Sequence, residues 1–112
     1  MAQVNLADYK NLYLQTAKEY VVSLLASYNK LVSDSQNKDA LNQIHIASHS
    51  LKGQSQVMGF MDVTVLSGAI EKKSRDILTG VAQANDKFII FLKDSVDKLN
   101  LELAQIEKGD VV

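Results

Sequence analysis

Several residue types are missing or scarce in this chain of 112 residues, and each absence narrows the possible folds. There is no cysteine, so disulfide bonds and thiolate metal sites are excluded. There is no proline and there are only 5 glycines, although all-β domains of this length usually place both residues at their turns. Without proline, long helices can run unbroken. The composition therefore favours an all-α protein.

The chain also lacks a large net charge and a long apolar run. Its 12 basic and 13 acidic residues leave a formal net charge of -1, unlike the basic footprint of a nucleic-acid-binding protein. No apolar stretch approaches the roughly 20 residues that span a bilayer, and the first residues do not form a signal peptide. We expect a soluble, cytoplasmic protein that binds neither nucleic acid nor membrane.

Apolar residues recur with a period near 3.6 along most of the chain, which is typical of amphipathic helices. Because the segments between them are short, neighbouring helices should be antiparallel. The sequence therefore predicts an antiparallel up-down four-helix bundle in which residues 1–112 form one domain. The predicted helices span roughly residues 6–32, 38–58, 62–79 and 85–107.

Residues at the ends of these segments support the predicted boundaries. Ser33–Asn37 is polar and favours a turn followed by an N-cap. Gly59 and Gly80 suit the left-handed conformation that often ends a helix. Asp62 can cap the third helix, and we expect Asn85 or a neighbouring residue to start the fourth.

The apolar stripes predict which residues of the first two helices face the core. On the first helix they are Leu6, Tyr9, Tyr13, Ala17, Tyr20, Val21, Leu24, Tyr28 and Leu31. On the second helix the inward residues are Leu41, Ile44, Ala47, Ser48, Leu51 and Ser55.

The second predicted helix contains both histidines of the chain. With an advance of about 100° per residue, His49 lies roughly 120–140° from the direction of the core and points to solvent. His45, one turn earlier, lies nearer the boundary of the core. Lys52 and Gln56 lie on the same flank of the helix as His49.

Gly53 faces outward one turn after His49, although glycine inside a helix is unfavourable by about 1 kcal/mol relative to alanine. Its missing side chain would let another protein approach the imidazole. Ile46 and Val57 also point outward and form a small apolar patch around Gly53, which suggests a docking surface. Single exposed apolar residues such as Ile90 are normal on a protein surface and are only weak evidence for self-association. We therefore expect a monomer.

Residues 49–53 read His-Ser-Leu-Lys-Gly and are followed, after five residues, by Gly59. This pattern resembles the H-x-L-K-G-x5-G signature of histidine phosphotransfer (HPt) domains. The run Met58-Gly59-Phe60 is similar to that of the phosphoacceptor domains of chemotaxis histidine kinases. The resemblance implies a four-helix bundle that carries a phosphoryl group between proteins.

The resemblance also implies roles for individual residues. His49 would be the phosphoacceptor, and Lys52 would lie close to the phosphoryl group and offset its charge. Gly53 would clear the approach path, and Gly59 would end the helix. Glu71 matches the glutamate that hydrogen-bonds the acceptor histidine in chemotaxis kinases.

The same kinases tend to have a second histidine one turn before that glutamate, where this chain has Ser67 or Gly68. The implied partners are a histidine kinase and the receiver domains of response regulators. The chain would bind no cofactor of its own, and the partner would supply Mg²⁺. It would have no ATP site and would act as a phosphoryl carrier rather than as an enzyme.

Other interpretations of the same residues are weaker. His45 and His49 have the spacing of a helical zinc pair, but no third ligand completes a site, and we expect no bound metal. His45 is more typical of a rim histidine, with tuning of His49 as its alternative role. The chain could be the phosphoacceptor domain of a chemotaxis-type kinase, or an inert helical interaction module whose His49 is never modified.

Overall fold

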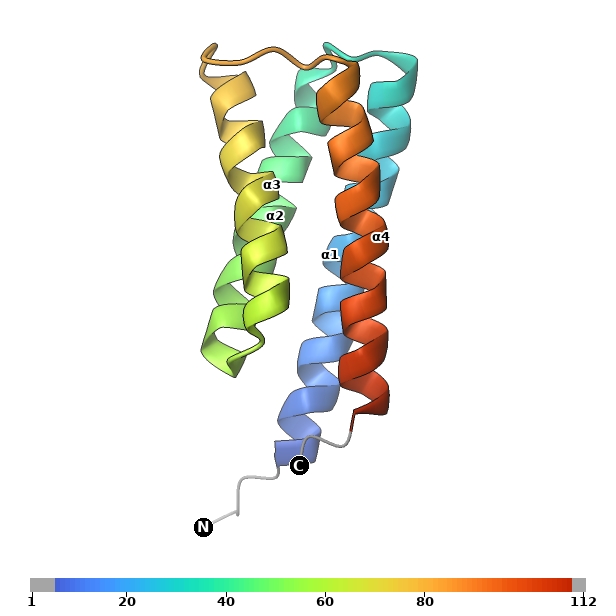
Figure 1. Ribbon diagram of the computed structural model, residues 1–112, viewed down its shortest axis with the longest axis vertical. Helices are drawn as coiled ribbons and strands as arrows, with labels where there is room; N and C mark the ends of the chain where they lie inside the picture. Colours follow the sequence, from blue (N-terminus) through green and yellow to red (C-terminus); the bar gives the residue numbers. More distant parts are fainter. Residues whose placement is uncertain (1–5, 110–112) are drawn as a thin grey trace.

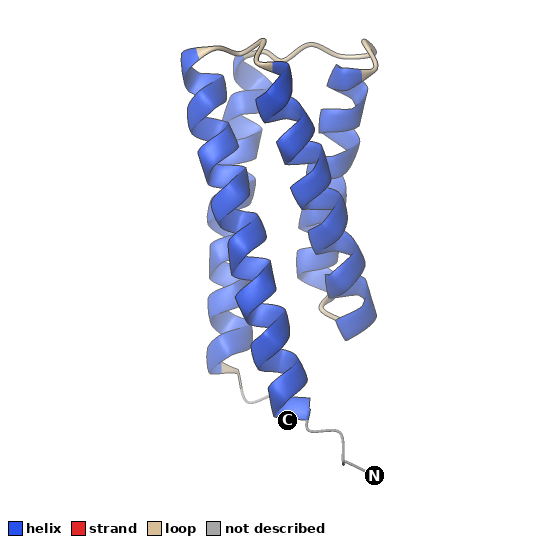
Figure 2. Cartoon of the chain, turned by 180° about the vertical axis from the view of Figure 1, so that it is seen from behind, coloured by secondary structure: helices blue, strands red, loops and turns tan. Residues whose placement is uncertain are grey.

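The computed structural model describes residues 6–109, which form four helices and no strand (Figure 1). Each helix runs antiparallel to the next, and α1 also packs along α4, so the four close into an up-down bundle (Figure 2). The predicted fold class is therefore confirmed. None of the described helices is long and apolar enough to cross a membrane. The helices are α1 (Leu6–Ser33), α2 (Lys38–Met58), α3 (Met61–Leu78) and α4 (Asp86–Lys108).

Local capping explains where most of these helices begin and end. The side chains of Asn37 and Asn85 each accept a hydrogen bond from the backbone N–H three residues later, at 3.0 and 3.1 Å. Gly59 ends α2 with a φ of 78°, and Gly80 follows α3 with a φ of 83°. A residue with a Cβ would be strained at both positions, so the glycines belong to the turns themselves.

The prediction that Asp62 caps α3 was wrong. The helix begins one residue earlier, its N-cap is Phe60, and no side chain caps it there. The reason is the short α2–α3 turn, in which the N–H of Phe60 already donates to the carbonyl of Ser55 at 2.9 Å. Asp62 instead lies in the first turn of α3, where a negative charge suits the helix dipole.

The core lies between the four helices and contains the predicted inward residues of α2, all of which are buried. The stripe on α1 differs at its N-terminal end, because Tyr9 is 51% exposed while Leu14 is buried. The first turns of α1 extend past the α2–α3 turn, so fewer helices face them (Figure 1). Leu6 begins α1, and its side chain lies outside the described residues.

Helices α2 and α3 are in extensive contact, and both carry small residues that are buried. Ser48 and Ser55 on α2 and Ser67 and Ser74 on α3 are fully buried. Small side chains at a helix contact allow the two axes to approach closely. This interface therefore brings a carboxylate of α3 within reach of the exposed edge of α2.

Candidate functional site

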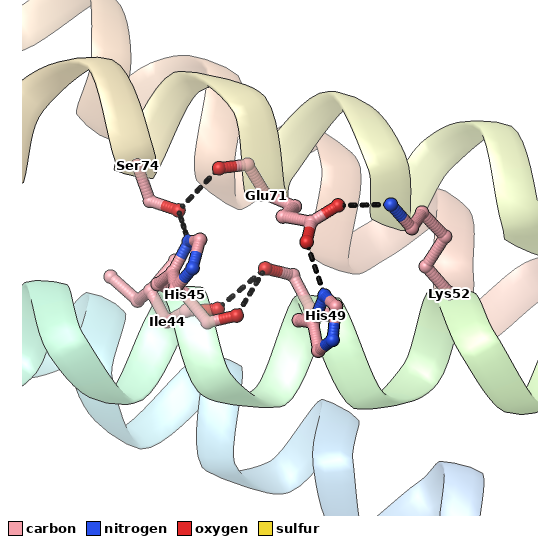
Figure 3. A network of polar contacts seen from close by, with 7 residues as sticks. Ile44, His45, His49, Lys52, Glu71 and Ser74 are labelled. Carbon is pink, nitrogen blue, oxygen red and sulfur yellow. Dashed lines mark hydrogen bonds and ion pairs between the residues drawn. The ribbon is translucent and has the colours of Figure 1, made fainter.

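His49 lies on the outer face of α2, with its side chain 67% exposed, as predicted. One edge of the ring is nevertheless anchored, because Nδ1 is hydrogen-bonded to Oε2 of Glu71 on α3 (Figure 3). The second ring nitrogen, Nε2, lies on the opposite side of the ring from Glu71. The imidazole is therefore held at one nitrogen and open at the other.

Glu71 is almost completely buried, with its side chain only 7% exposed. Its other oxygen, Oε1, accepts a hydrogen bond from Nζ of Lys52 at 2.5 Å. Burial raises the pKa of Glu71, but the hydrogen bonds and electrostatic attraction of Lys52 and His49 outweigh burial and hold the pKa below its ordinary value. Glu71 is thus an ionised carboxylate at neutral pH.

The negative charge of Glu71 determines which ring nitrogen of His49 carries the proton that the two residues share. An ionised carboxylate can only accept hydrogen bonds, so Nδ1 of His49 must carry the shared proton. In a neutral imidazole this leaves Nε2 with a free lone pair. The arrangement therefore presents an exposed nucleophilic nitrogen whose tautomer is set by a buried partner.

The ammonium group of Lys52 forms an ion pair with Glu71, the same carboxylate that holds Nδ1 of His49 (Figure 3). The buried carboxylate attracts it because an unpaired charge at that depth would be costly. In the unphosphorylated structure, Lys52 therefore influences His49 through its ion pair with Glu71. The role that the family resemblance implies for Lys52, beside the phosphoryl group, stays a prediction.

His45 is half-buried one turn before His49, and the two rings stack with centroids 6.4 Å apart. Nδ1 of His45 lies 3.5 Å from the hydroxyl of Ser74, which donates to the backbone carbonyl of Glu71 at 3.0 Å. Sequence reasoning missed Ser74, although its position three residues after Glu71 places it on the same face of α3. Within residues 6–109, no three acidic, histidine or cysteine side chains form a group that could hold a metal ion.

The outer face of α2 has the exposure that was predicted for it. A Cβ built on Gly53 would meet no heavy atom within 4 Å, so the fold does not require a glycine there. Val57 is 86% exposed and Ile46 is also exposed. Gln56 is exposed outside the hydrogen-bonded network of His49, and Gly59 is the C-cap of α2.

An open apolar groove of about 690 Å³ runs between α1 and α2 beside His49. Gly53 and Val57 line it, whereas Ile46 does not. Sequence reasoning missed the contribution of α1, because Tyr9 was assigned to the core and Leu12 lies outside the predicted core stripe of that helix. The groove is lined by Tyr9, Leu12, Tyr13, Thr16, Tyr20, His49, Ser50, Gly53, Gln54, Val57 and Met58.

Comparison with known proteins agrees with this geometry. The family model of the Hpt domain matches residues 8–109. The chain belongs to the Hpt domain family. Chemotaxis protein CheA of Halobacterium salinarum is 29% identical to this Hpt domain over 105 residues, which cover 93% of the chain but 16% of that protein. The CheA phosphotransferase domain from Thermotoga maritima has the same fold, with a TM-score of 0.87 and 19% identity over 93% of this chain and 99% of that one.

These findings confirm the predicted family and its general function. The chain is a histidine phosphotransfer domain, a module that carries phosphoryl groups and is distinct from the catalytic domain of a kinase. The Hpt domain spans about one sixth of the length of the CheA relative, at 16%.

Proposed function

We propose that Nε2 of His49 accepts a phosphoryl group from one signalling protein and passes it to an aspartate of a receiver domain. The observation that supports this role best is the pairing of an exposed Nε2 with a buried, ionised Glu71 on the other nitrogen. That pairing fixes the nucleophilic tautomer before any partner binds. Because Glu71 already holds the imidazole in place, no further ordering of the ring is needed at the moment of transfer.

The transfer step balances without a further reactant. The lone pair of Nε2 attacks the phosphorus of a donor aspartyl phosphate, the P–O bond breaks, and the donor carboxylate leaves. Nδ1–H remains hydrogen-bonded to Glu71, which offsets the positive charge that develops on the ring. The reverse step delivers the phosphoryl group to the aspartate of a second receiver.

The protein partners supply the rest of the chemistry in this proposal. A histidine kinase or a receiver provides the donor, and the receiver or kinase brings the Mg²⁺ that neutralises the phosphoryl oxygens in flight. Lys52 offsets the negative charge of Glu71. Because the partners bring the phosphodonor and the Mg²⁺, this chain acts as a carrier rather than as a complete catalyst. A cytoplasmic location and a monomeric state remain predictions.

We infer that the partner docks on the groove between α1 and α2. Gly53 lies beside His49 with open space around it, and Val57 and Leu12 extend an apolar surface on either side. Contiguous exposed apolar surface next to a reactive group is typical of a protein-binding site. Ile46, outside the groove, would lie at the edge of this contact.

The test is incubation of the chain with a phosphorylated receiver domain, or with an active histidine kinase and ATP, followed by intact-mass analysis. The expected result is an acid-labile, alkali-stable gain of one phosphoryl group that is absent in His49→Gln. If the wild-type chain gains no mass with any of a panel of donors, it is an inert helical module, and the proposal is wrong.

A second candidate is the phosphoacceptor domain of a chemotaxis-type kinase, which the contact between Glu71 and His49 and the similarity to CheA favour. The two candidates differ in the donor. The second predicts efficient phosphorylation by the ATP-binding domain of a chemotaxis kinase and slow phosphorylation by phosphorylated receivers. A comparison of the two initial rates distinguishes them.

A further inference from the structure

Gly68 lies in the middle of α3, a position where glycine weakens a helix relative to alanine. Its φ is not positive, so the backbone conformation there is open to any residue. The position is half-exposed rather than tightly enclosed. Neither the helix nor its packing in the core therefore explains a glycine.

The surroundings of Gly68 point to Lys52 instead. Outside its own helix, the one heavy atom within 4 Å of a Cβ built on Gly68 is Cδ of Lys52, at 3.4 Å. The aliphatic part of the lysine side chain thus crosses α3 over the bare backbone of Gly68. It ends with Nζ at 2.5 Å from Oε1 of Glu71, three residues further along the same face of α3.

We propose that Gly68 is a positioning residue that leaves the space in which Lys52 crosses α3 to reach Glu71. The proposal rests on the proposed function, because Lys52 and Glu71 matter through the tautomer of His49. A single added methyl group would still fit, since 3.4 Å is an ordinary contact. We expect a β-branched side chain, which carries two further groups on Cβ, to crowd Cδ of Lys52 and displace it.

Displacing the ammonium group of Lys52 should raise the pKa of Glu71. Without the ammonium group, burial remains as an influence that raises the pKa of Glu71, and one of the two groups that lower it is lost. The carboxylate then accepts less strongly from Nδ1 of His49. The nucleophilic tautomer of His49 is less well defined as a result.

The test compares Gly68→Ala with Gly68→Val, each in the wild-type and in the Lys52→Ala background. Small-molecule phosphoramidate serves as the donor, so that docking of a protein partner has no influence. We expect Gly68→Val to slow phosphorylation of His49 about threefold to tenfold, which lies within the range of coupling between contacting side chains. Gly68→Ala should stay within about twofold, and Gly68→Val should have no further effect once Lys52 is alanine.

A second readout is the pKa of Glu71, followed by the chemical shift of its carboxyl carbon. It should rise in Gly68→Val and stay unchanged in Gly68→Ala. This readout tests Gly68 even if no partner protein phosphorylates the chain, so failure of the proposed function would be seen separately. An unchanged pKa in Gly68→Val, or equal slowing in both backgrounds, would overturn the proposal.

Gly68→Thr, which has the same shape as the valine variant, replaces it if that variant does not fold. If both variants lose the circular dichroism of a folded bundle, Gly68 supports packing of α3, and the positioning role is wrong.

Discussion

His49 lies between two flanks of α2 that differ in almost every physical property. On the α3 side, a buried carboxylate joins the imidazole to the ammonium group of Lys52. On the α1 side, an open groove of tyrosine and aliphatic side chains begins at Ser50 and Gly53 and has no charged residue in its lining. The polar groups of the first flank are bonded to one another within the chain, whereas the apolar groove of the second flank is left uncovered.

A small carrier can thus keep the groups that set its chemistry apart from the groups that bind its partner. Groups that set the state of the acceptor nitrogen must be positioned before the partner arrives, so they are buried and hydrogen-bonded. Groups that bind the partner must remain exposed until it arrives. Variants on the α3 flank should therefore affect every phosphodonor, whereas variants on the α1 flank should affect only protein donors.

The largest effect is expected from Glu71→Ala. Without the carboxylate, His49 can adopt either tautomer and rotate freely, so phosphorylation should slow about 10- to 100-fold, as when a carboxylate that orients a histidine is removed elsewhere. The slowing should be equal with phosphoramidate and with a phosphorylated receiver. An unchanged rate with phosphoramidate would remove Glu71 from the account of the site.

A smaller effect is expected from Gly53→Leu, which fills the open space beside His49. Transfer from a receiver should slow about tenfold, the equivalent of roughly 1.4 kcal/mol of lost docking or alignment. The rate with phosphoramidate should not change, since a Cβ at this position meets no heavy atom within 4 Å beyond the backbone of its own helix. Asn100→Leu, an exposed position on α4, is the matched control and should leave both rates unaltered. Equal slowing with both donors would contradict the separation of the two flanks.

Leu12→Asp tests whether α1 belongs to the docking surface. A charge in the apolar groove should weaken receiver binding about threefold to tenfold, through the loss of roughly 1 kcal/mol of apolar contact. Titration calorimetry with an unphosphorylated receiver measures the dissociation constant. If the constant is unchanged, the docking surface is confined to α2.

A prediction on stability rather than on transfer compares the wild type with Glu71→Gln in acid. The pKa of Glu71 is lowered in the folded state, so its ionisation stabilises the fold above the ordinary value of 4.5. This stabilisation is lost as the pH falls through the lower, folded pKa. Urea unfolding should show the wild type more stable by about 1–3 kcal/mol at pH 7, with the difference shrinking below pH 4.5. A difference that does not change with pH would mean that the charge of Glu71 adds nothing to stability.

Features that depend on neighbouring residues along the chain could be predicted from the sequence. The αL end of α2 at Gly59, the cap at Asn85 and the outward face of Gly53 follow from local conformation and helical periodicity. The start of α3 was misplaced because a turn of the backbone, and not the side chain of Asp62, begins that helix.

Features that depend on how helices pack against each other could not be predicted in the same way. The contact of Glu71 with His49 was expected only from the family resemblance, and Ser74 beside His45 was missed. The groove was missed on its α1 side because the exposure of Tyr9 depends on how far α1 extends past its neighbours. Relative rotation and length of packed helices are tertiary properties, and the hydrophobic period alone does not determine them.

The tautomer of His49 and the site of its phosphorylation can both be measured by ¹⁵N NMR of the ring before and after reaction with phosphoramidate. We expect the free protein to show the Nδ1–H tautomer at neutral pH and the phosphorylated protein to show its bond at Nε2. A free protein with the proton on Nε2, or a product phosphorylated on Nδ1, would contradict the central claim that Glu71 prepares Nε2 as the acceptor.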